Sequence, residues 1–407
     1  MKWEKVKLGD IATCIQPGPF GSQLHNSDYS KEGTPIIMPK DIVGGAIVHS
    51  GLLKVSEEHV KRLSRHQVYE GNLMVARKGD VRKCAYITAN ENGWMTGSDC
   101  LKVVLDESKC YPKFIYYQLR SEHIGRWLEK VSIGATMPSL NTGLLSGIEM
   151  VLPPIEIQKQ IAGILSVYDD LIENNQKQIK LLEEAARRLY KEWFVDLHFP
   201  GHENTKIVDG VPEGWRVASI ADICDTVGGG TPSTKIQSYY ERGDILWVTP
   251  TDITRNFSLA LLDTEKKITP EGLKNSSAKM LPAETILMTS RASVGFFGMC
   301  KYEVCTNQGF ISCIPKRENL QMYLLFNLKS RVEEIRQKAG GSTYLEISKT
   351  VFRELKIILP KDEVLAEYQK NVHDIFDEIY CRTEMIRSLV DMRNRLLPKL
   401  MSGEVEV

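Results

Sequence analysis

The chain carries between residues 152 and 161 the sequence Leu152-Pro153-Pro154-Ile155-Glu156-Ile157-Gln158-Lys159-Gln160-Ile161, which opens its longest regular pattern. From Ile161 to Trp193, apolar side chains recur at heptad spacing without an intervening proline. Such a stripe predicts a long amphipathic helix that begins just after the two prolines and packs against a partner.

A second stripe of the same kind follows Pro360 and runs from Val372 to Leu397. Each predicted helix has roughly 35 residues and a length of about 50 Å. Because an apolar stripe that faces water promotes aggregation, we expect the two helices to pair with each other, antiparallel, as a rod between the parts that they connect. Asn175 falls on the first stripe, where it either sets the register of a coiled coil or lies at a solvated edge.

The two stripes belong to an internal duplication. Five short matches occur in the same order in both halves of the chain: residues 3–11 with 215–223, 39–42 with 250–253, 73–77 with 287–291, 134–136 with 341–343, and 152–153 with 359–360. We therefore expect two copies of one module, each with a globular part followed by a long helix.

The globular part of each copy contains short apolar runs bounded by Gly, Pro, Asn and Asp, which is typical of half-buried strands. Helical spacing predicts a helix at Lys113–Glu129 and another at Met322–Lys338. The predicted fold class is α+β: two globular mixed α/β domains separated by two long antiparallel coiled-coil helices. The predicted segments are residues 1–150, 151–204, 205–358 and 359–407, in the order domain, helix and linker, domain, helix.

Composition limits the function classes. The net charge is zero, yet residues 1–150 hold 19 basic and 16 acidic side chains, and residues 205–358 hold 20 and 17. This small basic excess permits a phosphate-binding face without requiring one. Nine cysteines are scattered without a CxxC pair, and no apolar run approaches the roughly 20 residues that span a bilayer. We expect a cytoplasmic protein with reduced thiols and no membrane contact.

No catalytic motif is present in convincing form. Gly228–Pro232 lacks the GK[ST] of a P-loop, and no Asn-Pro-Pro-Tyr-like methyltransferase signature occurs. Asp252 with Glu265-Lys266-Lys267 loosely imitates a nuclease metal site, but the first copy has no equivalent triplet. The eight histidines show no HExxH or HxH grouping. We therefore expect no catalytic residue, no metal and no cofactor in this chain.

Over essentially its whole length, the chain resembles the specificity subunit of Type I restriction-modification systems. The resemblance is carried by the glycine-rich turn Gly229–Ser233, the turn Ser290–Gly295 with its counterpart Ala76–Asp80, the closing segment Gly134–Leu140, the helix opening at 152–161 and the helix end at Arg188–Asp196. Three positions depart from the family pattern: Ala292 stands where Gly is usual, Ile157 replaces a Glu, and Lys361 replaces the second Pro of the other copy.

The resemblance implies that the two globular parts are target-recognition domains of a non-catalytic subunit that reads a bipartite target in double-stranded DNA. Two methyltransferase (modification) subunits would dock on it and use S-adenosylmethionine to methylate adenine in each half of the target. Restriction (motor-nuclease) subunits would join them, so that S-adenosylmethionine, ATP and Mg²⁺ are expected in the partner subunits. The alternative is a coiled-coil adaptor with two protein-binding modules.

DNA contacts require Arg, Lys, Asn, Gln, Ser or Thr on loops that reach the duplex. The candidate DNA-binding residues are Ser22, Gln23, Lys40, Arg77, Lys78, Arg82, Lys83, Thr231, Ser233, Thr251, Arg291, Asn307, Gln308 and Thr343. The match of residues 73–77 with 287–291 makes Arg77 and Arg291 equivalent, which predicts that both bind phosphate. For any one of these residues, the alternative is a solvated surface side chain.

Overall fold

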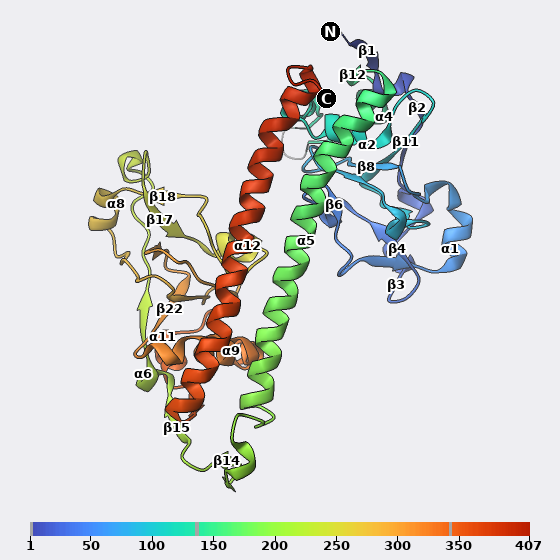
Figure 1. Cartoon of the computed structure of the whole chain (residues 1–407). Coiled ribbons are helices and arrows are strands. Elements are labelled where there is room, and N and C mark those ends of the chain that lie inside the picture. The colour runs from blue at the N-terminus through green and yellow to red at the C-terminus, as the bar shows by residue number, and fades with distance from the viewer. Residues whose placement is uncertain (1–2, 135–137, 342–343) are drawn as a thin grey trace. The chain divides into compact units, whose positions relative to one another are not determined.

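The computed structural model describes residues 3–134, 138–341 and 344–407. These residues form two compact units. Unit 1 comprises the chain up to Asp170 together with Leu389–Val407, and unit 2 comprises Leu171–Ser388. Helices α5 (Ile155–Phe194) and α12 (Asp362–Ser402) each contribute to both units (Figure 1). None of the described helices is both long enough and apolar enough to cross a membrane.

Unit 1 is built on two four-stranded sheets. The first has the order β2-β11-β8-β9 and is antiparallel throughout, and the second has the order β10-β4-β7-β3 with β10 and β4 parallel. Strand β1 pairs with β12, and β5 with β6. The strands are β1 Glu4–Lys7, β2 Ala12–Pro17, β3 Tyr29–Ser30, β4 Thr34–Ile37, β5 Ile42–Val43, β6 Ala46–Ile47, β7 Leu53–Val55, β8 Leu73–Ala76, β9 Cys84–Tyr86, β10 Met95–Thr96, β11 Cys100–Leu105 and β12 Glu149–Leu152.

The core of unit 1 explains why the long helices do not form a separate domain. Strand β8 is buried at all four residues. Phe114 of α2 (Pro112–Leu119) packs in the same core as Leu73 of β8. Ile161 of α5 and Leu400 of α12 belong to this core too. The apolar stripes of both long helices therefore cover a sheet-based core as well as each other.

The stretch that we expected to form one helix at Lys113–Glu129 is two helices, α2 and α3 (Glu122–Val131). Ser121 lies between them, and its side-chain oxygen accepts the backbone N–H of Ile124, which begins a new helix. The stretch expected at Met322–Lys338 likewise divides into α9 (Gln321–Ser330) and α10 (Val332–Gln337). Both stretches are helical as predicted, but each is two helices; Ser121 caps the second helix in unit 1, whereas α10 begins after Arg331 without a side-chain cap.

Unit 2 repeats this architecture. Its four-stranded sheet has the order β16-β22-β19-β20, its three-stranded sheet has the order β18-β17-β21, and β15 pairs with β23. The strands are β13 Ile207–Val208, β14 Val211–Pro212, β15 Arg216–Ser219, β16 Cys224–Gly228, β17 Ile245–Val248, β18 Lys267–Ile268, β19 Ile286–Thr289, β20 Phe297–Gly298, β21 Cys305–Thr306, β22 Phe310–Pro315 and β23 Lys356–Leu359. The short helices of the two units are α1 Glu57–Arg62, α4 Thr142–Ser146, α6 Ile220–Ile223, α7 Pro250–Arg255, α8 Pro270–Lys274 and α11 Lys349–Arg353.

One hydrogen bond occurs in both units and confirms the duplication. The side-chain oxygen of Gln158, in the first turn of α5, accepts the backbone N–H of Tyr111 at 2.8 Å. Gln369 of α12 accepts the N–H of Met322 at 2.9 Å in the same way. Both bonds satisfy a backbone donor at the start of the helix that follows β11 or β22, which is α2 in unit 1 and α9 in unit 2.

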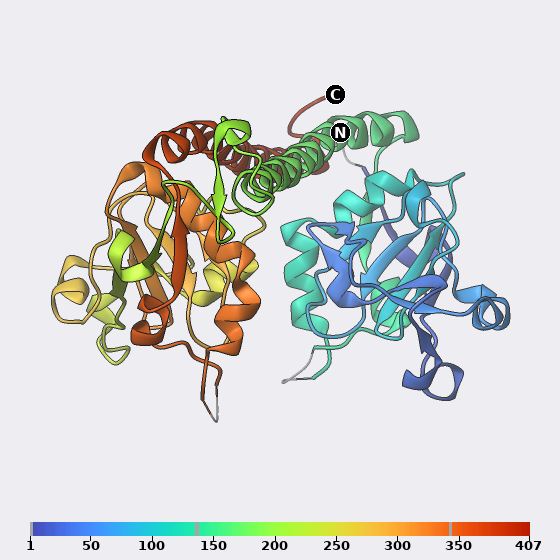
Figure 2. The same cartoon turned by 90° about the horizontal axis from the view of Figure 1, so that it is seen from below.

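The antiparallel pairing of α5 and α12 is confirmed within each unit (Figures 1 and 2). In unit 1, Arg393 of α12 donates to Asp169 of α5, and in unit 2, Arg382 of α12 donates to Asn175 of α5. Residue numbers rise on one helix as they fall on the other, as antiparallel helices require. The helices have 40 and 41 residues, somewhat more than expected, and the predicted limits at residues 150 and 358 fall inside β12 and β23.

Candidate nucleic-acid interface

The turn after β8 is the basic turn of unit 1. Arg77 follows the strand directly, and its backbone N–H donates to the carbonyl of Asp99 at 2.7 Å, while its carbonyl accepts from Leu140 at 2.8 Å. Two residues later, the N–H of Gly79 donates to the carbonyl of Pro138 at 3.0 Å. The turn is thus fixed on both sides by neighbouring segments, which places its basic side chains on a rigid frame.

The corresponding turn of unit 2 follows β19 with the same set of bonds. The N–H of Ser290 donates to Gly309 at 2.8 Å, and the Ser290 carbonyl accepts from Ile347 at 3.0 Å. Two residues later, the N–H of Ala292 donates to the carbonyl of Leu345 at 2.8 Å. Ser290 therefore holds the backbone position that Arg77 holds in unit 1.

The strand registers give the same assignment. Ala76 of β8 lies opposite the first residue of β11, and Thr289 of β19 lies opposite the first residue of β22. Ala76 therefore corresponds to Thr289, and Lys78 to Arg291. The equivalence of Arg77 and Arg291 expected from the sequence match was wrong by one residue. Arg291 is the counterpart of Lys78.

This register also explains the family position at which Ala292 replaces Gly. Its counterpart is Gly79, and both residues have left-handed backbone conformations, with φ of +60° for Ala292 and +80° for Gly79. A side chain is strained in this region, and glycine is not. The turn therefore keeps its shape in unit 2 at a conformational cost.

In each unit, a glycine lets the loop after β2 or β16 approach the segment before β11 or β22 closely. A Cβ on Gly18 would lie 1.9 Å from the carbonyl oxygen of Gly97, and a Cβ on Gly229 would lie 2.1 Å from that of Asn307. No side chain fits in either place. This close approach brings the loop that begins at Gly18 or Gly229 next to the segment that precedes β11 or β22.

The candidate residues of unit 1 differ in what they contact. Lys78 Nζ lies 3.2 Å from a carboxylate oxygen of Asp99, and Lys40 Nζ lies 2.8 Å from Asp41. Lys83 closes the turn after β8, because its backbone carbonyl accepts the N–H of Ala76 at 2.9 Å, while its side chain donates to the carbonyl of Pro39, next to Lys40, at 3.0 Å. The backbone carbonyl of Gln23 accepts a hydrogen bond from the guanidinium of Arg62. Ser22 lies in the short 3-10 turn Gly21–Gln23, and its side chain lies outside the described residues.

Arg82 is engaged within the protein. Its guanidinium forms ion pairs with Glu122 and with Glu129, the latter at 3.5 Å, and the hydrogen bond to Glu122 raises the pKa of Arg82. A phosphate would have to replace two carboxylates at this guanidinium, against one at Lys78 or Arg291, so Arg82 is the weaker candidate for a DNA contact.

In unit 2, the structure brings three of the candidates together. Thr231 donates a hydrogen bond to the side-chain oxygen of Gln308, and Asn307 precedes Gln308 and accepts the N–H of Gly309 at 2.9 Å. Ser233 is exposed on the same loop as Thr231, and Thr251 is exposed in α7. Thr343 lies outside the described residues.

Sequence reasoning missed the aromatic partners of the two arginines. The guanidinium carbon of Arg77 lies 5.7 Å from the ring centroid of Phe20, and that of Arg291 lies 5.9 Å from the ring of Tyr344. Both distances are within the range of a cation–π contact. No spacing rule could have found Phe20, because it lies more than fifty residues from Arg77 in the chain.

The nuclease hypothesis is answered by the contacts of Asp252. One oxygen of this carboxylate accepts the N–H and the hydroxyl of Thr249 at 2.8 and 2.6 Å, and the other accepts the N–H of Glu265 at 2.8 Å. Asp252 therefore caps α7 and fixes a loop. Asp41 accepts the N–H of Met38 in the matching place of unit 1, so the aspartate is a shared structural feature.

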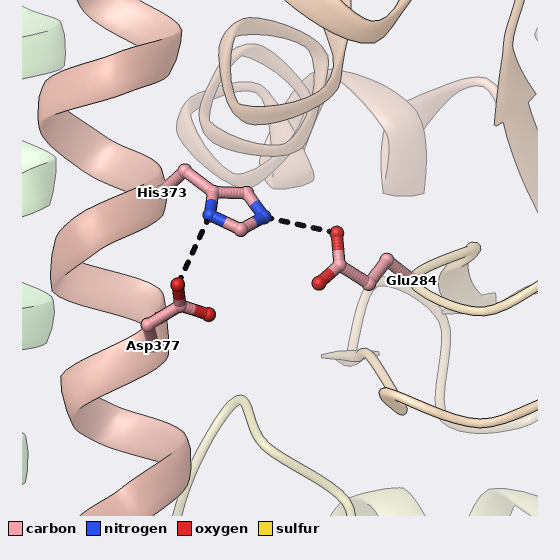
Figure 3. A group of neighbouring side chains, drawn as sticks. All are labelled: Glu284, His373 and Asp377. Carbon is pink, nitrogen blue, oxygen red and sulfur yellow. Dashed lines mark hydrogen bonds and ion pairs between the residues drawn. The ribbon is translucent and has the colours of Figure 1, made fainter.

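One group of residues with metal-ligating side chains occurs among the described residues, at Glu284, His373 and Asp377 (Figure 3). Nε2 of His373 lies 3.0 Å from Glu284, and Nδ1 lies 3.4 Å from Asp377. Lys301 Nζ lies 2.6 Å from Asp377 and neutralises it. Because each ring nitrogen already faces a carboxylate, this arrangement fastens α12 to the turn before β19 and leaves no ring nitrogen directed at an open ligand position.

The family model described as "Type I restriction modification DNA specificity domain" matches residues 1–184 and 212–389. The MjaIX specificity subunit of a Type I restriction enzyme from Methanocaldococcus jannaschii is 25% identical over 422 residues, covering 100% of this chain and 94% of that protein. The EcoR124I/EcoR124II specificity subunit from Escherichia coli is 30% identical over 310 residues, covering 71% of this chain and 69% of that protein.

A solved structure has the same fold. The S subunit of a Type I restriction-modification system from M. genitalium superposes with a TM-score of 0.59 at 17% identity, and the match covers 98% of this chain and 96% of that one. Each matched range of the family model includes one of the two equivalent sheets, β2-β11-β8-β9 or β16-β22-β19-β20, and most of one long helix, as the internal duplication requires.

Proposed function

Because the chain belongs to the Type I restriction modification DNA specificity family, we propose that it reads a bipartite DNA target, with each unit recognising one half-site. It is the DNA specificity subunit of a Type I restriction-modification system. The single observation that carries the bipartite reading is the duplication itself, because two equivalent basic turns stand on two equivalent sheets. Unlike half-sites require readers that share a frame and differ in their side chains.

The chain acts without catalysis of its own in this proposal. Two modification subunits would bind it and methylate adenine with S-adenosylmethionine, and restriction subunits that use ATP and Mg²⁺ would cleave unmodified DNA. The contacts of Asp252 support a non-catalytic chain, because the one carboxylate that imitates a nuclease ligand is used for capping. The work would take place in the cytoplasm, where the DNA is. A protein-binding adaptor has no support in the comparisons.

The basic turns are the part of the proposal with the most direct chemistry. Lys78 and Arg291 occupy equivalent positions, and each is a cation with one acidic neighbour, Asp99 or Glu346. A cation retained in both readers suits contact with the phosphate backbone, which is the same in both half-sites. Phosphate would exchange with the acidic neighbour when DNA binds.

Methylome sequencing tests this function. The chain is expressed with its modification subunit in cells that lack other adenine methylation. A bipartite modified-adenine motif that disappears when this chain is deleted is the expected result. Methylation without this chain, or a motif with only one specific block, would contradict the proposal.

A further inference from the structure

Arg77 of unit 1 is a cation that packs against an aromatic ring and has no acidic partner among the described residues. Its guanidinium rests on the ring of Phe20, which is 54% exposed. Among the described residues, no carboxylate pairs with Arg77, and its buried Nε has no hydrogen-bond partner. A partly buried guanidinium without acceptors is costly to hold, so the bound state is expected to supply them.

Unit 2 lacks both members of this pair. Ser290 stands in the backbone position of Arg77 and is 3% exposed. Counting from the equivalent sheet positions Pro17 and Gly228, Thr231 stands in the position of Phe20, and it bonds to Gln308 instead of supporting a cation. The two positions thus differ together between the units, whereas the next position keeps a cation as Lys78 or Arg291.

This contrast separates two kinds of DNA contact. Phosphates are alike in every half-site, so positions that bind them can be shared by two readers, and positions that read bases must differ. By this criterion, Lys78 and Arg291 belong to phosphate binding, while Arg77 with Phe20 belongs to sequence reading in unit 1.

We propose, on the premise of the proposed function, that Arg77 reads a guanine in the half-site of unit 1 and that Phe20 is its positioning residue. Guanine presents two acceptors, O6 and N7, in the major groove, and the planar fork of arginine matches them with two parallel hydrogen bonds. The Phe20 ring covers one face of the guanidinium and restricts its orientation, and the described residues accept no hydrogen bond from its Nη donors.

The test compares the methylomes of cells that express the modification subunit with the wild-type chain, with Arg77→Ala and with Arg77→Lys. Both variants are expected to lose the preference for one G·C pair in one half of the motif and to keep the other half. Lysine fails because it lacks the fork. Binding of a labelled duplex with the wild-type motif should weaken about 5- to 150-fold for Arg77→Ala, which corresponds to 1–3 kcal/mol per bidentate pair.

Lys78→Ala is the matched control one residue away. It is expected to weaken binding to the motif duplex and to a scrambled duplex alike, with the motif unchanged. Phe20→Leu should weaken binding of the motif duplex about 2- to 5-fold and should have no further effect in the Arg77→Ala background. A purely structural role of Phe20 would instead give an effect that adds to that of Arg77→Ala.

The outcomes distinguish this inference from the function on which it rests. If the wild-type chain directs no bipartite motif, the proposed function fails. If the wild-type motif is bipartite and Arg77→Ala and Arg77→Lys both leave every base of it unchanged, only the inference fails. Thermal unfolding of the purified chains checks that the variants are folded. If Arg77→Ala is unfolded, the test is repeated with Arg77→Gln, which keeps most of the side-chain volume.

Discussion

Arg382 of α12 donates from its guanidinium to the side-chain oxygen of Asn175 of α5 at 3.1 Å. Asn175 is only 3% exposed, and its own amide donates to the carbonyl of Leu171 at 2.8 Å. The interpretation of Asn175 as a buried polar residue between the helices is therefore confirmed, and that of a solvated edge is wrong. Whether it sets the register of the pair stays a prediction.

Asn175→Ala is expected to destabilise unit 2 by about 1–2 kcal/mol, because it leaves a donor of the partly buried Arg382 without its acceptor. The measurement is the midpoint of urea unfolding followed by circular dichroism. Asn174→Ala is the matched control, because Asn174 is exposed on the same helix. Equal shifts for the two variants would contradict the assigned role of Asn175.

Arg291→Ala is expected to weaken binding to all duplex sequences and to reduce the salt dependence of binding, the slope of log K against log salt, by about one. The physical reason is the loss of one phosphate contact at the position that unit 1 fills with Lys78. Fluorescence anisotropy at several salt concentrations measures both quantities.

Arg82→Ala serves as the control for Arg291→Ala, because Glu122 and Glu129 already engage that guanidinium. It should leave the slope unchanged. A loss of preference at a single base pair in Arg291→Ala would reassign Arg291 to base reading.

The sequence predicted the duplication, the two long helices and their antiparallel pairing because each depends on a repeated pattern. The register of β8 relative to β19 was predicted wrongly. Residues 73–77 and 287–291 share Leu, Met and Arg at the same spacing, yet the strands align one residue away. A buried face normally fixes register, but β8 and β19 are buried on both faces, so burial could not exclude the shifted match.

The base-reading pair was beyond sequence reasoning for a different reason. Arg77 was a candidate from its residue type, but Phe20 acquires its meaning only when the loop after β2 folds next to the turn after β8. Such contacts depend on tertiary structure and have no periodicity. Helix breaks were missed for a related reason, since one serine cap at Ser121 outweighs an apolar spacing that continues past it.

Ala292→Gly is expected to stabilise the chain by about 0.5–1 kcal/mol. The left-handed conformation at φ +60° costs an alanine about 1–2 kcal/mol, and the greater freedom of glycine in the unfolded chain returns part of the gain. The free energy of unfolding is measured in urea. Gly79→Ala, in the equivalent place of unit 1, should destabilise by a similar amount, and a stabilising effect of that variant would contradict the assignment.

His66 makes the stability of unit 1 dependent on pH. The imidazole is 3% exposed, and burial, with the charges of Arg65 and Lys102, lowers its pKa from 6.5 to about 4. Below pH 6.5, the unfolded chain binds a proton that the folded chain refuses. The full stability is therefore present above pH 6.5 and is lost progressively as the pH falls toward 4, by up to about 3 kcal/mol.

His66→Gln is expected to reduce this loss, since glutamine can bond to Gln16 and Arg65 without taking up a proton. Urea unfolding at about pH 7 and about pH 5 measures the difference between the variant and the wild-type chain. His123→Gln, at an exposed position of α3, should behave as the wild type does. If the midpoints of His66→Gln and of the wild-type chain fell equally between the two pH values, the lowered pKa of His66 would be contradicted, because His66 would then contribute nothing to the pH dependence.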